Sequence, residues 1–175
     1  VESVLDIAHA IDGPVYVRML RGEVPRLFDT PMEFNQARVL TRAGEDIDEP
    51  ADIVIVTSGI CTEEAMRAVP AMVDRGLKVT HLHVSTLKPF SDPTVTAALT
   101  SARKGVITME NHLVTGGLGS AVAEVMAENA IAVPLSRIGL NDTYAHGASL
   151  PYLLKEYQLD ARALVDRAEA LTGSS

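Results

Sequence analysis

The chain has 175 residues, of which 47% are apolar, so a disordered chain is excluded and a domain with a hydrophobic core is expected. Its 15 Lys and Arg against 23 Asp and Glu give a net charge of −8, which argues against a nucleic-acid-binding surface. The single cysteine, Cys61, excludes an internal disulfide, and no apolar run approaches the ~20 residues that span a bilayer. We therefore expect a soluble, cytoplasmic protein that binds neither nucleic acid nor a membrane.

The first 36 residues do not resemble the start of a domain. Apolar residues between Val1 and Ile11 recur at helical spacing, and Asp12-Gly13-Pro14 ends the predicted helix. Val15–Met19 is predicted to form a strand, and residues 22–36 form a polar connection that contains two prolines. A lone helix–strand pair of this kind indicates the end of a domain whose beginning lies outside this chain.

From residue 37 onward, predicted strands alternate with predicted helices. The alternation predicts an α/β fold with a mostly parallel sheet covered by helices on both faces. The expected strands are 37–42, 53–57, 79–84, 106–109 and 135–139, and the expected helices are 62–74, one that begins near 92–93, 120–130, 150–157 and 160–171.

Three local details within these elements can be predicted as well. Thr62 is expected to cap the helix that follows it, and Pro70 is expected to kink or break that helix. His81 and His83 share one face of their strand. A metal site there is disfavoured, because no Cys, Asp or Glu joins the two histidines at ligand spacing.

A glycine-rich turn, Gly116-Gly117-Leu118-Gly119, connects the fourth strand to an apolar helix whose face includes Ala121, Val122, Val125, Met126 and Ala130. The amides at a helix N-terminus can bind phosphate, so a cofactor site is one interpretation. The residues do not complete the G-x-G-x-x-G pattern of dinucleotide-binding turns, however. A turn that brings helix and sheet close together is the favoured interpretation.

Several side chains are candidates for chemistry. His112 stands beside Glu110 at the end of a strand, where it would either line a ligand site or bond its own loop or a neighbouring subunit. His146, in a polar loop with Asp142 and Tyr144, is a surface or interface residue. Cys61 lies near a helix N-terminus, which can activate a thiol, although an inert cysteine is the favoured interpretation.

Arg18 and Arg21 flank the end of the predicted first strand. A guanidinium group at the end of a strand can bind phosphate through two parallel hydrogen bonds. A surface or interdomain salt bridge is the alternative, and composition does not decide between them.

Taken together, several segments resemble the C-terminal portion of transketolases, and above all the separately encoded C-terminal subunits of split transketolases. The segments that carry the resemblance are 12–22, 53–59, Leu87-Lys88-Pro89-Phe90 and 109–121. The resemblance implies that residues 1–36 are the end of a pyrimidine-binding domain plus a linker. Residues 37–175 would be the third domain, a three-layer α/β/α unit with a five-stranded, mostly parallel sheet whose first strand is antiparallel.

The resemblance also implies an activity. The family transfers two-carbon ketol units between sugar phosphates, using thiamine diphosphate and a divalent cation, Mg²⁺ or Ca²⁺. Arg21 matches the arginine that holds the phosphate of the acceptor sugar, and His112 would line the site. No catalytic, cofactor-binding or metal-binding residue is carried over to this chain. It would be structural and inactive alone, acting as a homodimer with upstream domains or an N-terminal subunit.

Other readings stay open. 1-Deoxy-xylulose-5-phosphate synthase shares the architecture and a His-Gly pair like His146-Gly147, although Glu110-Asn111-His112 before the glycine turn favours transketolase. The beta subunits of 2-oxo acid dehydrogenases have a similar turn, but Arg21-Gly22 is not expected there. A reading of another class is a non-catalytic interaction domain that only dimerises. Dimer contacts are expected near 37–40 and in the loop 141–149.

Overall fold

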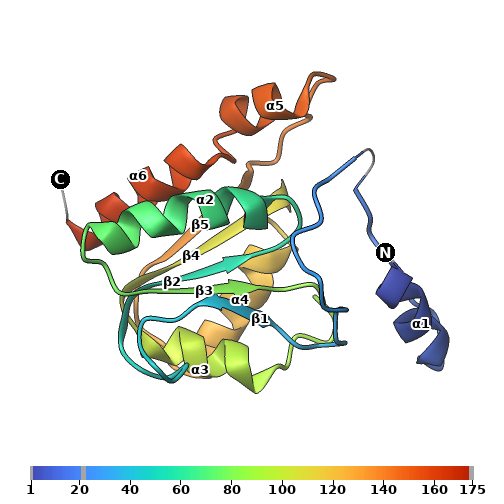
Figure 1. Ribbon diagram of the computed structural model, residues 1–175, viewed down its shortest axis with the longest axis horizontal. Helices are drawn as coiled ribbons and strands as arrows, with labels where there is room; N and C mark the ends of the chain where they lie inside the picture. Colours follow the sequence, from blue (N-terminus) through green and yellow to red (C-terminus); the bar gives the residue numbers. More distant parts are fainter. Residues whose placement is uncertain (1, 21–22, 174–175) are drawn as a thin grey trace.

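A computed structural model describes residues 2–20 and 23–173, and it shows the predicted three-layer α/β/α arrangement (Figure 1). The sheet has the strand order β1-β3-β2-β4-β5, in which β1 runs antiparallel to β3 and all other pairs are parallel. The strands are β1 (Arg38–Thr41), β2 (Ala51–Thr57), β3 (Val79–His83), β4 (Ala102–Leu113) and β5 (Leu135–Leu140). The helices are α1 (Glu2–Ala10), α2 (Cys61–Asp74), α3 (Pro93–Ser101), α4 (Leu118–Glu128), α5 (Leu150–Glu156) and α6 (Ala161–Thr172).

The central strand β2 feeds two hydrophobic cores, one on each face of the sheet. Ile53 and Ile55 face α2 and α6, whereas Val54 and Val56 face α3 and α4, and all four are completely buried. A strand covered on both faces has no polar side to maintain, which explains its unbroken β-branched sequence. Each such side chain stabilises the fold by about 1.5–3 kcal/mol through its burial.

The predicted starts of two helices are confirmed. The Asp92 carboxylate accepts a hydrogen bond from the Thr94 amide at 2.9 Å, and Pro93 occupies the first turn of α3. The Asp160 carboxylate caps α6 by accepting from the Ala163 amide at 3.0 Å. Both caps satisfy amides that have no partner within their helix.

The prediction that Thr62 caps α2 is wrong. The helix begins at Cys61, its N-cap residue Ile60 makes no side-chain cap, and the Thr62 hydroxyl instead bonds Thr57 of β2. Of the kink or break expected at Pro70, the break is absent, because α2 continues to Asp74. Pro70 lies on the exposed side of α2, where water can hydrate the carbonyl group that loses its amide partner.

The apolar face predicted for α4 is correct only in part. Val122 and Met126 are buried against the sheet, and Ala121 and Val125 are half-buried. Ala130 does not belong to the face: α4 ends at Glu128, and Ala130 is exposed with a left-handed φ of 53°. The chain turns there towards β5, which helical periodicity alone does not reveal.

The predicted strand Val15–Met19 is not a strand. Helix α1 forms as expected, but residues 14–20 have no regular structure, and Val15, Tyr16 and Met19 are exposed. A strand needs a neighbouring strand to receive its backbone hydrogen bonds, and the sheet of the described residues ends at β1 and β5. The alternating pattern therefore has no partner within the described part of the chain.

Candidate functional site

The glycine turn is closed by a carboxylate of the chain itself. Glu110, in β4 and 2% exposed, accepts hydrogen bonds from the amides of Leu118 and Gly119, each at 2.8 Å. A Cβ atom at Gly117 would lie 2.0 Å from the Glu110 Oε2 atom, so only glycine fits there. The Glu110 carboxylate is thus the anion that bonds the first amides of α4 and lies at the positive end of the helix dipole. The contacts at the turn support the packing interpretation, and the Glu110 carboxylate occupies the two amides that a phosphate would need.

A buried chain of polar side chains joins β2, β3 and α2. The Thr57 hydroxyl lies 2.9 Å from the His81 Nε2 atom and 2.9 Å from the Thr62 hydroxyl. The Thr62 hydroxyl in turn lies 2.7 Å from the His83 Nδ1 atom. These bonds fix the orientation of both imidazole rings. The two histidines share a face as predicted, and each bonds a threonine hydroxyl.

Both imidazoles are neutral at pH 7. The pKa of His81 is lowered to about 4, mainly by burial and to a lesser extent by the nearby His83. The pKa of His83 is also lowered to about 4, mainly by burial and to a lesser extent by the positive charge of Arg38. Within the described part of the chain, the His81 Nδ1 atom has no hydrogen-bond partner. Among residues 2–20 and 23–173, no group of three His, Cys, Asp or Glu side chains is arranged to hold a metal ion. The network is therefore structural at neutral pH.

The linker that precedes β1 contacts this network at the end of β3. The Phe28 ring packs on the His83 ring with 5.0 Å between centroids, and the Arg38 guanidinium lies 4.8 Å from the Phe28 centroid. Arg38 also donates to the Thr30 carbonyl at 2.8 Å. This stack fastens residues 28–30 to the carboxyl edge of the sheet.

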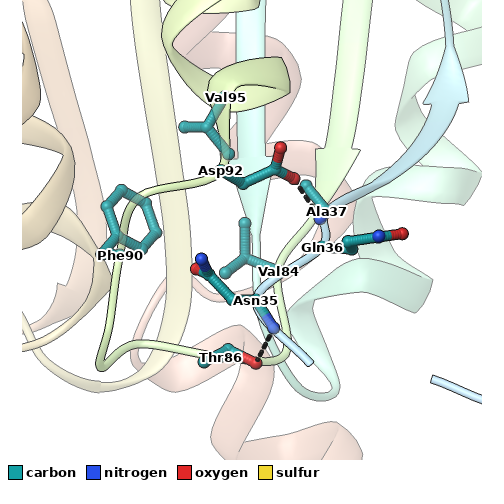
Figure 2. A pocket seen from close by; sticks show the side chains of 8 residues that line it. All are labelled: Asn35, Gln36, Ala37, Val84, Thr86, Phe90, Asp92 and Val95. Atoms are coloured by element: carbon teal, nitrogen blue, oxygen red, sulfur yellow. Dashed lines mark hydrogen bonds between the residues drawn. The ribbon is translucent and has the colours of Figure 1, made fainter. Parts of the chain in front are cut away.

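Further along, the linker covers a small pocket beside α3 (Figure 2). The Asn35 amide donates to the Thr86 hydroxyl at 3.0 Å, and the Ala37 amide donates to the Asp92 carboxylate at 2.6 Å. Even with the adjoining open solvent included, the empty space at this pocket is about 200 Å³, less than the roughly 300 Å³ at which ligand pockets begin. It serves to seat the linker and has no room for a cofactor.

Arg18 brings the N-terminal segment to the end of β4. Its Nη2 atom donates to the Asn111 carbonyl at 2.9 Å, so its partner is a backbone oxygen and not a carboxylate. The Asn111 side chain covers Gly59, where an added Cβ would lie 2.6 Å from the Asn111 Oδ1 atom. The ends of β2 and β4 and residue 18 thus meet at one edge. Arg21, three residues further on, lies outside the described residues.

The remaining candidates lie in different surroundings. His112 is exposed, and its Nδ1 atom lies 3.3 Å from the Leu113 carbonyl, so its role as a site-lining residue stays a prediction. Cys61 is fully buried, and burial, Glu110 and Glu64 together raise the pKa of its thiol to about 12, which makes it the inert cysteine expected. His146 bonds the Tyr157 hydroxyl through Nδ1 at 3.2 Å.

The sequence did not reveal what Glu110, Thr57 and Phe28 do. Glu110 accepts from amides eight and nine residues later, and Thr57 bonds His81 twenty-four residues away. One signal was available for Glu110: an acidic residue at the end of a strand, shortly before a glycine-rich helix start, suits the positive end of that helix. No comparable local signal marks Thr57 or Phe28.

Fold and site together define a three-layer α/β domain. At the edge of its sheet where the parallel strands end, side chains of the domain bond one another, and the N-terminal segment is attached there through Arg18. The family model of the transketolase C-terminal domain matches residues 43–164. The chain therefore belongs to the transketolase C-terminal domain family.

The chain is also similar in sequence to individual proteins. The 6-deoxy-6-sulfo-D-fructose transketolase subunit of Clostridium sp. (strain MSTE9) is 37% identical over 169 residues, which cover 95% of this chain and 49% of the relative. A 1-deoxy-D-xylulose-5-phosphate synthase of Listeria innocua is 30% identical over 177 residues, covering 99% of this chain and 27% of that protein.

A solved structure described as a split gene transketolase, inactive beta4 tetramer, superposes with a TM-score of 0.82 at 33% identity, covering 98% of this chain and 54% of that one. The chain thus spans about half the length of the transketolase relatives it matches. In the described part of the chain, no helix is both long and apolar enough to cross a membrane.

Proposed function

We propose that this chain is the C-terminal part of a transketolase that transfers two-carbon ketol units between sugar phosphates, with thiamine diphosphate and Mg²⁺ or Ca²⁺ as cofactors. The observation that carries the proposal is the family match over residues 43–164 together with transketolase relatives aligned along 95% or more of the chain. The chain itself has a structural, self-associating role in the cytoplasm. It is inactive without an upstream half, whether that half is a separate subunit or part of the same polypeptide.

The surroundings of the carboxyl edge support a cofactor held by the upstream half. The amides of Leu118 and Gly119 are occupied by Glu110, and His81 and His83 are neutral and bonded to threonines. The amides offer no free anion site, and among residues 2–20 and 23–173 no group of three His, Cys, Asp or Glu side chains is arranged to hold a cation. The diphosphate and the metal ion would therefore be bound by the cofactor-binding and pyrimidine domains or by an N-terminal subunit.

Residues 1–36 would complete the pyrimidine-binding domain. Val15, Tyr16 and Met19 are exposed apolar side chains in a stretch with a strand-like sequence and no partner strand. An upstream sheet would bury these side chains and pair with their backbone. Residues 37–175 form the third domain in this division, and the bond from Arg18 to the Asn111 carbonyl connects the two parts.

Arg21 would hold the terminal anionic group of the acceptor sugar. Arg21 lies three residues from Arg18, which bonds the Asn111 carbonyl at the carboxyl edge of the sheet. A guanidinium group can bind a phosphate group through two parallel hydrogen bonds. The sulfonated sugar in the name of the Clostridium relative carries a comparable anion. Phosphorylated and sulfonated sugars should therefore both be offered as substrates, and His112 would lie beside them.

The test uses the complete protein, assembled from both halves with thiamine diphosphate and Mg²⁺. Arg21→Ala should raise KM for phosphorylated acceptors at least about tenfold and leave a non-phosphorylated acceptor unaffected, because only the phosphate loses a partner. Arg26→Ala is the matched control, since Arg26 is an exposed arginine of the same linker that bonds linker carbonyls. Equal losses with both acceptors would contradict the role of Arg21. An assembled protein that transfers no ketol unit would favour a non-catalytic interaction domain.

A second candidate is the C-terminal part of a 1-deoxy-D-xylulose-5-phosphate synthase, favoured by the 30% identity that extends over 99% of this chain. The two candidates differ in their products. The same assembled protein would be assayed for 1-deoxy-D-xylulose 5-phosphate and for ketol transfer between sugar phosphates. Whichever product accumulates decides between them.

A further inference from the structure

The bond from Arg18 to the Asn111 carbonyl joins the N-terminal segment to the domain that begins at β1. Among residues 2–20 and 23–173, no other hydrogen bond connects 2–20 with 37–173. Figure 1 shows α1 apart from the sheet, and the segment after it (blue) on the side towards which the arrows of β2, β3 and β4 point. A hydrogen bond from a charged guanidinium is stronger than one between neutral groups. Arg18 therefore decides where this segment meets the domain.

The acceptor of this bond is held in place by the domain. Asn111 directly follows Glu110, whose carboxylate is bonded to two amides of α4 at 2.8 Å each. The Asn111 side chain lies over Gly59, in the turn between β2 and α2, where an added Cβ would be 2.6 Å from the Asn111 Oδ1 atom. Asn111 is thus fixed from two sides, by α4 and by this turn. Arg18 bonds a rigid carbonyl group, so the domain sets the position of Arg18.

The charge of Arg18 is also close to the start of α2. Burial and two carboxylates raise the pKa of the Cys61 thiol, and the positive charge of Arg18 is near enough to oppose that rise. The hydrogen-bond partner of Arg18 is nevertheless a backbone oxygen and not a carboxylate. An interdomain salt bridge is therefore not what this arginine makes with the domain. Its bond holds one segment of backbone against another.

The two residues proposed to meet the acceptor are connected by this bond. His112 directly follows Asn111 and is exposed at the same edge of the sheet, and Arg21 follows Arg18 by three residues. Three residues of fully extended chain span at most about 11 Å. The bond therefore limits how far position 21 can move from the edge that carries His112.

We propose that Arg18 is a positioning residue of the acceptor site: through the Asn111 carbonyl it holds Arg21 at the edge of the sheet that carries His112. The inference rests on the proposed function, in which Arg21 binds the acceptor's phosphate, and it adds a role for a residue that touches no substrate. A preorganised arginine loses less freedom when the phosphate binds. Loss of the bond should therefore weaken the binding of phosphorylated acceptors and spare the chemical step.

Arg18→Ala tests this role in the complete protein, assembled from both halves with thiamine diphosphate and Mg²⁺. KM for a phosphorylated acceptor should rise about three- to tenfold at unchanged kcat, because Arg21 is no longer held in place. KM for a non-phosphorylated acceptor should stay within about twofold of the wild type. Arg26→Ala is the matched control, an exposed arginine that also bonds backbone carbonyls, and it should change neither KM.

Two further variants separate positioning from direct phosphate binding. Arg18→Lys should restore KM to within about threefold of the wild type, because an ammonium group can donate to a single carbonyl oxygen but cannot replace a guanidinium that binds phosphate through two parallel bonds. In an Arg21→Ala background, Arg18→Ala should cause no additional phosphate-specific loss, because a positioning residue acts only through the residue it positions. An additional loss would mean that Arg18 binds the phosphate itself, and would overturn the inference.

The outcomes also separate this inference from the proposed function. If the wild type transfers ketol units and Arg18→Ala matches it with both acceptors, only the inference is overturned. If Arg18→Ala weakens both acceptors equally, or the assembled protein dissociates into its halves in analytical ultracentrifugation, Arg18 only joins the two parts and the inference is again overturned. A wild type that transfers no ketol unit would overturn the proposed function, and this inference with it.

Discussion

Residues 2–36 and the domain from β1 to α6 differ in how they are stabilised. In the domain, both faces of the sheet are covered and β2 is almost completely buried. In the N-terminal segment, Val15, Tyr16 and Met19 stay exposed, and single contacts such as the Arg18–Asn111 bond attach it to the domain. The comparison shows that an alternating apolar sequence becomes a strand only when another strand accepts its hydrogen bonds.

This difference should separate two levels of stability. Loss of a contact inside the domain should lower the free energy of unfolding of the whole domain, because its elements share two cores. Loss of a contact between the segment and the domain should release the segment alone. Three substitutions test this separation, from the largest expected effect to the smallest.

Glu110→Ala should have the largest effect, lowering the free energy of unfolding by about 3 kcal/mol, because two buried amides of α4 lose a charged acceptor. Urea unfolding at pH 7 measures the change. Glu124→Ala, an exposed position on the same helix, should stay within about 0.5 kcal/mol of the wild type. A loss below about 1 kcal/mol for Glu110→Ala would mean that water or the backbone replaces the carboxylate.

The second test is the pH dependence of the domain. The pKa of His81 is about 4 in the folded chain against an ordinary value of 6.5, so the unfolded state binds a proton first as pH falls. The stability from neutral His81 is fully present above pH 6.5 and is lost as pH falls from about 6.5 to about 4. The expected loss is about 3 kcal/mol for this residue.

His81→Phe removes this titration and should reduce the slope of stability against pH between 6.5 and 4, measured by urea unfolding. The substitution also removes the bond to Thr57, so the variant should have a lower free energy of unfolding than the wild type at pH 8. The difference at pH 8 is the reference from which the change with pH is measured. An unchanged slope in the variant would show that His81 is protonated in the folded domain over this range.

Phe28→Ala should have the smallest effect, about 1 kcal/mol, and a local one. It removes the ring that lies between His83 and Arg38, so hydrogen exchange should accelerate in the linker around residues 24–36 while β2 stays protected. Phe34→Ala is the matched control, since Phe34 is 43% exposed in the same linker. If exchange in β2 accelerated as well, the segment would belong to the same cooperative unit as the domain.

The candidate site could be predicted from the sequence in part. The strand end that carries Glu110, Asn111 and His112 was expected to lie at a ligand-accepting edge, and Arg18 does reach that edge. That Glu110 turns inward to bond α4 was not predicted, because the choice between a buried and an exposed carboxylate depends on how close the helix approaches. The Phe28–His83 contact joins residues 55 positions apart, and no local pattern encodes it.

The sequence by itself determined the elements whose signals are local. The β-branched run of β2, the helix starts at Asp92-Pro93 and Asp160 and the apolar periodicity of the helices act over a few residues, so each could be predicted without its neighbours. The tertiary structure decided the rest: that residues 14–20 are no strand, that Thr62 bonds Thr57 instead of capping α2, and that Glu110 closes the glycine turn. Hydrogen bonds between distant elements depend on which groups the fold brings within about 3 Å of each other.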